Sequence, residues 1–132
     1  MTKGLKDYVV WNLGGEATGT CLQGEIECSY ADLVAVFGPP NTEAGDQDKV
    51  DAEWILTFTL FGGVAKEIAT IYNYKTGKNY LGEDGMPTEE IEDWHIGGRR
   101  ADVVGYVASM IIAHYRERLG DIPRPAGAAK AA

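Results

Sequence analysis

The chain has 132 residues and a formal net charge of −8 at pH 7, from 12 Lys and Arg against 20 Asp and Glu. Its hydrophobic share of 45% is enough for one core, so we expect a single domain over residues 1–122 and a disordered tail at 123–132. The negative charge argues against nucleic acid as a partner, because such binding depends on many Lys and Arg contacts to phosphate. No run of about 18 apolar residues occurs, so we expect no membrane span.

Alternating polarity and helical spacing predict the elements of the fold. The expected strands lie at residues 8–13, 21–28, 53–60, 66–75 and 91–96. The expected helices lie at residues 29–37 and 101–120. These elements predict an α+β fold class: an antiparallel sheet of about four to five strands, with one short helix and one long C-terminal helix packed on it.

The first half of the chain combines a strand with a capped helix. In the strand at 21–28 we expect Leu22 and Ile26 to face the same way, with Gly24 at a bulge. Ser29 followed by Asp32 resembles a capping box, which predicts that the first helix begins there.

The central hairpin is the most apolar part of the chain. Residues 53–60 place Trp54, Leu56 and Phe58 on one face, which we expect the C-terminal helix to cover. A glycine turn at 61–63 leads into the second strand, and a long loop containing three glycines follows it.

The junction before the last helix could bind an anion. Gly97 and Gly98 are expected to end a strand, and Arg99 and Arg100 to open the helix. Free backbone N–H groups, the positive end of a helix dipole and two guanidinium groups would suit phosphate. The alternative is a tight turn followed by two solvated arginines. His95 could lend a hydrogen bond or a proton to the same anion, or could be a structural residue.

Aromatic and amide side chains near the second hairpin strand could bind a nucleobase. The candidates are Tyr72, Asn73, Tyr74, Asn79 and Tyr80, with Trp94 nearby. Tyrosine rings stack on bases and amides hydrogen-bond to them, although strand tyrosines commonly serve packing instead. Together with the arginines, these residues are the parts of a nucleotide-binding site.

The sequence offers little for catalysis. It has no P-loop, no HExxH motif and no nucleophile elbow, so we expect no enzyme and no cofactor. Cys21, Cys28, His95 and His114 lack zinc-ligand spacing, so we expect no metal site. We expect both cysteines to be buried thiols, and His114 to be a packing residue on the last helix.

Five short motifs together resemble a group of small bacteriophage proteins. They are Leu22-Gln23-Gly24, Ser29 to Leu33, Phe37-Gly38-Pro39-Pro40, Ala69 to Lys75 and Trp94 to Gly98, within residues 20–115. The pattern resembles the first type of Thoeris anti-defence protein, a viral sponge. The chain departs from the expected pattern in having no basic residue between Lys6 and Lys49 to complete a phosphate clamp.

The resemblance implies a function in the cytoplasm of an infected bacterial host. Such sponges sequester cyclic ADP-ribose signals without cleaving them, in pockets shared between protomers of a homo-oligomer. Some relatives also trap cyclic oligonucleotides of another defence system, CBASS. The resemblance implies that the pocket uses Arg99 or Arg100, Tyr72 or Tyr74, and Asn73 or Asn79.

A different class of function is also open. The acidic surface, including the run at residues 89–93, could mimic nucleic acid and inhibit a basic host nuclease, as an anti-CRISPR or anti-restriction factor would.

Overall fold

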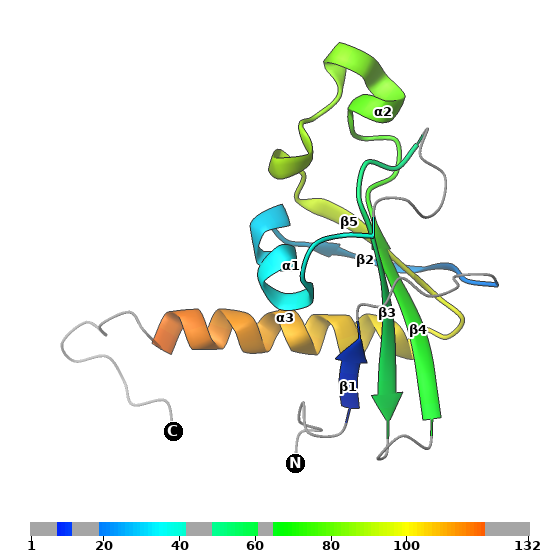
Figure 1. Cartoon of the computed structure of the whole chain (residues 1–132), viewed down its shortest axis with the longest axis vertical. Helices are drawn as coiled ribbons and strands as arrows, with labels where there is room; N and C mark the ends of the chain where they lie inside the picture. The colour runs from blue at the N-terminus through cyan, green and yellow to red at the C-terminus, as the bar shows by residue number, and fades with distance from the viewer. Residues whose placement is uncertain (1–7, 12–18, 42–48, 61–64, 121–132) are drawn as a thin grey trace.

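A computed structural model describes residues 8–11, 19–41, 49–60 and 65–120 of the chain (Figure 1). Its strands are β1 (Tyr8–Trp11), β2 (Cys21–Glu27), β3 (Glu53–Leu60), β4 (Ala65–Tyr72) and β5 (Asp93–Gly98). Its helices are α1 (Tyr30–Phe37), the single turn α2 (Lys78–Leu81) and α3 (Asp102–Gly120), with 3-10 turns at Gly82–Asp84 and Thr88–Glu90. The predicted turn at 61–63 and tail at 123–132 lie outside the described residues.

The strands form one antiparallel sheet in the order β1-β3-β4-β5-β2. This confirms the α+β prediction, including the long C-terminal helix. The predicted hairpin is β3 and β4, which pair along their whole length from Glu53 opposite Tyr72 to Leu60 opposite Ala65. Among the described residues, no helix combines the length and apolar character that a membrane span requires.

Two tryptophans from separate strands meet at the centre of the core. Trp54 and Trp94 are fully buried and contact edge to face, with ring centroids 5.4 Å apart. The Trp54 indole N–H donates to the carbonyl of Gly38 at 2.7 Å, and that of Trp94 donates to the carbonyl of Cys28 at 2.8 Å. Because Cys28 precedes α1 and Gly38 follows it, the two indoles hold both ends of this helix against the sheet.

The long helix packs on the same face of the sheet. Val103, Val107 and Ile111 of α3 belong to the core that also contains Leu56 and Phe58. The predicted covering of this strand face by the C-terminal helix is therefore confirmed. Ser29 accepts a hydrogen bond from the backbone N–H of Asp32 at 3.1 Å, as the capping pattern predicts for α1.

The strand β2 differs from its prediction in the direction of one side chain. Its register shifts between Leu22 and Gly24, so Leu22 lies opposite Gly97 while Ile26 lies opposite Trp94. The bulge was expected, but its effect was not: it turns Leu22 to the face away from the core, where the residue is 55% exposed.

The strand ends at the glycine pair as predicted, but Gly97 and Gly98 are themselves the last two residues of β5, beyond the expected limit at Ile96. Gly98 lies opposite Ala69, on the helix-covered face. A Cβ atom at Gly98 would stand 2.6 Å from Cγ2 of Val103 and 3.1 Å from the carbonyl oxygen of Ile68. The glycine is therefore needed for the close approach of α3 to the sheet, rather than for a turn.

We expect Gly98→Ala to lower the free energy of unfolding by about 1–3 kcal/mol, because the added methyl overpacks this contact. Gly105 of α3 is the matched control: it is exposed, and a Cβ there meets nothing within 4 Å. Gly105→Ala should stabilise the protein by roughly 0.5–1 kcal/mol through helix propensity. Urea denaturation of both variants measures the difference, and equal effects would contradict the packing role of Gly98.

Candidate ligand-binding face

The sheet carries a row of polar and aromatic side chains on the face opposite the core. In the register, Glu53 lies opposite Tyr72, Tyr72 opposite His95, and His95 opposite Glu25. These four residues, called here the cross-strand row, belong to the neighbouring strands β3, β4, β5 and β2. Since directly paired residues of antiparallel strands point to the same face, all four side chains lie on the side away from Trp54 and α3.

Side-chain contacts join three of the four members of the cross-strand row. The rings of Tyr72 and His95 meet edge to face, with centroids 5.5 Å apart. His95 Nε2 lies 3.6 Å from Oε1 of Glu25, whose side chain is 72% exposed. Glu53 is half-buried at the other end, and the described part of the chain offers its carboxyl group no hydrogen-bond or ion-pair partner.

A second set of aromatic contacts continues from His95. Tyr74 stacks on His95 at 5.9 Å, with an angle of 30° between the rings. The Lys75 ammonium lies 5.2 Å from the Tyr74 centroid and 5.4 Å from that of Tyr80 in α2. Tyr74 and Tyr80 are 39% and 47% exposed. We call Tyr72, Tyr74, Lys75, Tyr80 and His95 the tyrosine–histidine cluster, which presents flat rings and one positive charge to solvent.

The backbone at Lys75 is strained. Its φ of 61° makes it the one non-glycine residue with positive φ in the described part of the chain. Such a conformation costs on the order of 1–3 kcal/mol and persists where the surroundings impose it, often at functional sites. The Lys75 N–H donates to the carbonyl of Lys49 at 2.8 Å, which helps to hold this conformation and the ammonium between the two tyrosines.

Burial changes the acidity of two members of the cross-strand row. Removal from water raises the pKa of Glu53 from 4.5 to about 7, so the carboxyl group exchanges its proton near neutral pH. Burial, and secondarily the nearby Glu53 carboxyl, raises the pKa of the Tyr72 phenol. Tyr72 is therefore a neutral hydroxyl at physiological pH, and Glu53 alternates between a neutral and an ionised form.

The two asparagines predicted to bind a ligand both form hydrogen bonds within the protein. The Asn73 carbonyl accepts from the N–H groups of Asp51 and Ala52, and its amide donates to Asp51 and Thr76. With 0% exposure, Asn73 has used its full hydrogen-bonding capacity within the protein. The Asn79 amide donates to the carbonyl of Val50 at 3.1 Å. Both residues fix the chain that leads into β3.

The two arginines follow the end of β5. Arg99 is exposed at the bend between β5 and α3. Arg100 is paired with Asp102 at 3.2 Å and approaches Glu67 at 4.0 Å. Gly97 packs beside Thr70 and Tyr72, where a Cβ atom would stand 2.5 Å from Thr70 Oγ1. The predicted phosphate site of Gly97, Gly98, Arg99 and Arg100 is therefore not a glycine loop at a helix start.

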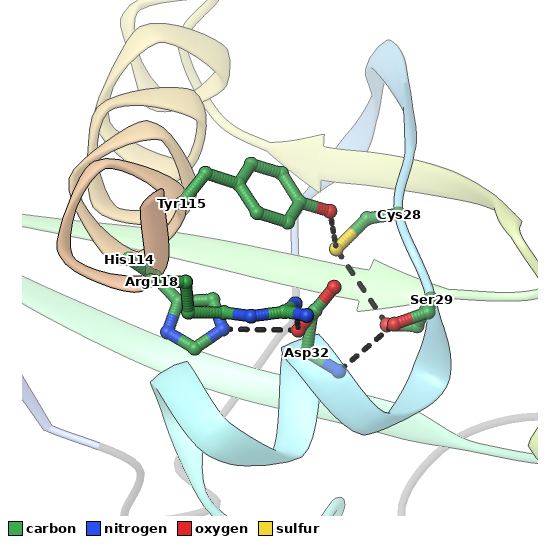
Figure 2. Close-up of polar contacts among 6 residues, drawn as sticks. All are labelled: Cys28, Ser29, Asp32, His114, Tyr115 and Arg118. Carbon is green, nitrogen blue, oxygen red and sulfur yellow. Dashed lines mark hydrogen bonds and ion pairs between the residues drawn. The ribbon is translucent and has the colours of Figure 1, made fainter. Parts of the chain in front are cut away.

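A separate polar cluster joins α1 to α3 (Figure 2). Both His114 Nε2 and Arg118 Nη1 contact Oδ1 of Asp32, at 3.0 and 2.7 Å. Burial alone would raise the pKa of the Asp32 carboxyl, but hydrogen bonds, chiefly from His114, and the charge of Arg118 hold it below its usual value. His114 is thus a polar partner of Asp32, where a packing role was expected.

The cysteine of this cluster is unsuited to nucleophilic chemistry. Cys28 is 3% exposed, accepts a hydrogen bond from the Tyr115 hydroxyl at 3.5 Å and donates to the carbonyl of Ser29. Burial raises the pKa of its thiol, so the reactive thiolate is scarce at neutral pH. Cys21, in contrast, is exposed, which corrects the expectation that both thiols are buried. In the described ranges, no three His, Cys, Asp or Glu side chains gather as metal ligands.

Comparison with protein-family models, with curated protein sequences and with solved structures gives no match to this chain. The sequence resemblance to anti-defence sponges therefore stays a prediction.

Three residues of the candidate face were not selected from the sequence: Glu53, Glu25 and Lys75. The two glutamates look like the solvent-facing positions of alternating strands, and only the strand register brings them into one row. Lys75 could have been noticed, because it directly follows Tyr74 where the strand pattern ends.

We expect Asp32→Asn to lower the free energy of unfolding at pH 7 by about 1–3 kcal/mol, since it removes charge-assisted hydrogen bonds between α1 and α3. Because the folded pKa of Asp32 lies below the unfolded value of 3.8, this contribution is present above that value and is lost as the pH falls through the folded pKa. Urea unfolding at a series of pH values should show that the difference in the free energy of unfolding between wild type and variant decreases below about pH 4.

The control for Asp32→Asn is Asp93→Asn, at an exposed carboxylate for which the structure shows no hydrogen bond. It should leave the free energy of unfolding within about 0.5 kcal/mol of wild type. If the difference in the free energy of unfolding between wild type and Asp32→Asn stayed constant down to about pH 3, the role of the ionised Asp32 carboxylate would be contradicted.

Proposed function

We propose that this protein binds a small molecule of the nucleotide class on its tyrosine–histidine cluster and holds it without chemical conversion. The observation that carries the proposal is the continuous contact from Tyr72 through His95 and Tyr74 to Lys75 and Tyr80. Half-exposed rings of this kind suit stacking with a base, and the ammonium between two of them suits a phosphate.

The chemistry of the face favours binding over catalysis. The cross-strand row contains no activated nucleophile, and its two carboxyl groups lie three strand spacings apart, roughly 14 Å, too far to act on one bond as acid and base. Retention without turnover is what a sequestering protein needs. In this proposal the protein acts by mass action and must be present at concentrations comparable to its ligand.

The finer proposal follows the sequence resemblance. In an infected bacterium, the ligand would be a cyclic nucleotide immune signal, such as a cyclic ADP-ribose isomer or a cyclic oligonucleotide. A homo-oligomer would bring a second protomer's groups to the exposed rings of Tyr74 and Tyr80. Arg99 and Arg100, which directly follow β5, would contribute to the phosphate contact in such an assembly.

A second candidate function is supported by an acidic edge. Glu27 and Asp93 lie directly opposite each other on β2 and β5, and both are exposed. Like charges in this position are unfavourable, and a basic protein surface would relieve the repulsion. This favours the alternative of an acidic inhibitor of a basic nuclease. The double variant Glu27→Gln with Asp93→Asn should then lose inhibition, while nucleotide binding should remain.

For the nucleotide proposal, we expect Tyr74→Ala to weaken binding about 5- to 150-fold, the equivalent of roughly 1–3 kcal/mol for one stacked base. Isothermal titration calorimetry with a panel of nucleotides that includes cyclic ADP-ribose isomers would measure the effect. Ligand released by heating should be chromatographically unchanged, in agreement with binding without turnover.

The matched control is Ile112→Ala, an exposed side chain on α3 that has no part in the cluster. It should bind the same nucleotide as tightly as wild type. Absence of binding by wild type to every member of the panel, or recovery of a cleaved ligand, would overturn the proposal.

A further inference from the structure

The Glu53 carboxyl group is a half-buried polar group of the candidate face. It is half-buried at one end of the cross-strand row, and among the described residues it has neither a hydrogen-bond nor an ion-pair partner. Glu25, at the other end, is largely exposed and lies near His95. A polar group withdrawn from water without a partner is unfavourable, so a ligand that hydrogen-bonds to Glu53 would recover part of that free energy.

The register places Glu53 where it can contact a base stacked on the rings. Glu53 and Tyr72 are directly paired, so their Cα atoms are roughly 4.5–5.5 Å apart and both side chains leave the same face. Tyr72 in turn contacts His95, which stacks with Tyr74. A flat ring lying over Tyr72 would therefore direct one polar edge toward the Glu53 carboxyl group.

Building on the nucleotide ligand proposed above, we propose that Glu53 recognises the base and binds the edge of an adenine ring in two hydrogen bonds. Adenine presents an amino donor beside a ring-nitrogen acceptor. A neutral carboxyl group presents the complementary pair, one O–H donor and one carbonyl acceptor. An ionised carboxylate has acceptors alone and matches the two N–H donors of guanine's pairing edge instead.

The protonation of Glu53 therefore determines which base it favours. Burial raises its pKa to about 7, so acidification below this value increases the neutral form and should strengthen adenine binding. Guanine binding should weaken over the same interval. Among the groups near it, Tyr72 faces Glu53 directly, with His95 and Glu25 further along the row. Tyr74 and Cys21 lie near Tyr72, and Lys49 and Asp51 precede Glu53 in the chain.

The test is calorimetric titration of the full chain with adenosine and guanosine 5′-monophosphates at pH 6, 7 and 8. The two probes carry the same phosphate, so its own titration affects both alike. When the pH falls from 8 to 6, the affinity of wild type for adenosine monophosphate should rise about tenfold more than the affinity of Glu53→Gln does. Glu53→Gln keeps one donor and one acceptor, so it should retain adenine binding and lose this pH dependence.

The control Glu117→Gln makes the same change at an exposed glutamate of α3, outside the candidate face, and should keep the wild-type pH dependence. Equal pH dependence of adenosine monophosphate binding in wild type and Glu53→Gln would overturn the role of Glu53 and leave the nucleotide proposal intact. Failure of wild type to bind either nucleotide or the wider panel would overturn both proposals.

A folding measurement tests the protonation of Glu53 without any ligand. The unfolded carboxyl group ionises near pH 4.5 and the folded one near 7. The stability of wild type relative to Glu53→Gln should therefore fall as the pH rises through this window and stay level above it. Urea unfolding of both proteins between pH 4 and 8 measures the difference. If the difference in the free energy of unfolding between the two proteins did not change between pH 4.5 and 7, the inference would be overturned.

Discussion

The edge-to-face contact of Trp54 and Trp94 determines the orientation of β5, and with it both faces of the sheet. The Trp94 indole is fully buried and donates to the carbonyl of Cys28, which leaves no freedom to rotate the strand. Since side chains alternate along a strand, His95 must then point away from the core. The candidate face is in this sense a consequence of core packing: a slip of β5 by one residue would bury His95 and expose Trp94.

The fold class could be predicted because its elements have strong local signals, such as the Trp54 to Phe58 alternation and the Ser29 cap. The role of Gly97 and Gly98 could not be predicted from the sequence. Gly97 and Gly98 before two arginines look like a turn, but both pair with β2 and β4, and Val103 on one face and Thr70 on the other leave no room for a side chain. That is a tertiary contact, which no local pattern records.

The candidate site was predictable in its residue types more than in its arrangement. The aromatic members of the tyrosine–histidine cluster were all selected from the sequence. Asn73 was selected too, since amides bind bases, but its side-chain amide is hydrogen-bonded to the segment that precedes β3. Glu53 and Glu25 were missed because they come into one row only through three separate strand pairings, each of which depends on packing across the sheet.

The charges around the face determine which part of a nucleotide would contribute most to the proposed binding. Arg100 is already paired with Asp102, so a phosphate would have to displace a carboxylate there, whereas Lys75 lies on the rings of Tyr74 and Tyr80. With a net charge of −8 on the whole chain, long-range attraction of a phosphate is weak. Affinity on this surface would therefore come mainly from stacking and from the hydrogen-bonding edge of the base, with the phosphate contact at Lys75 as a local addition.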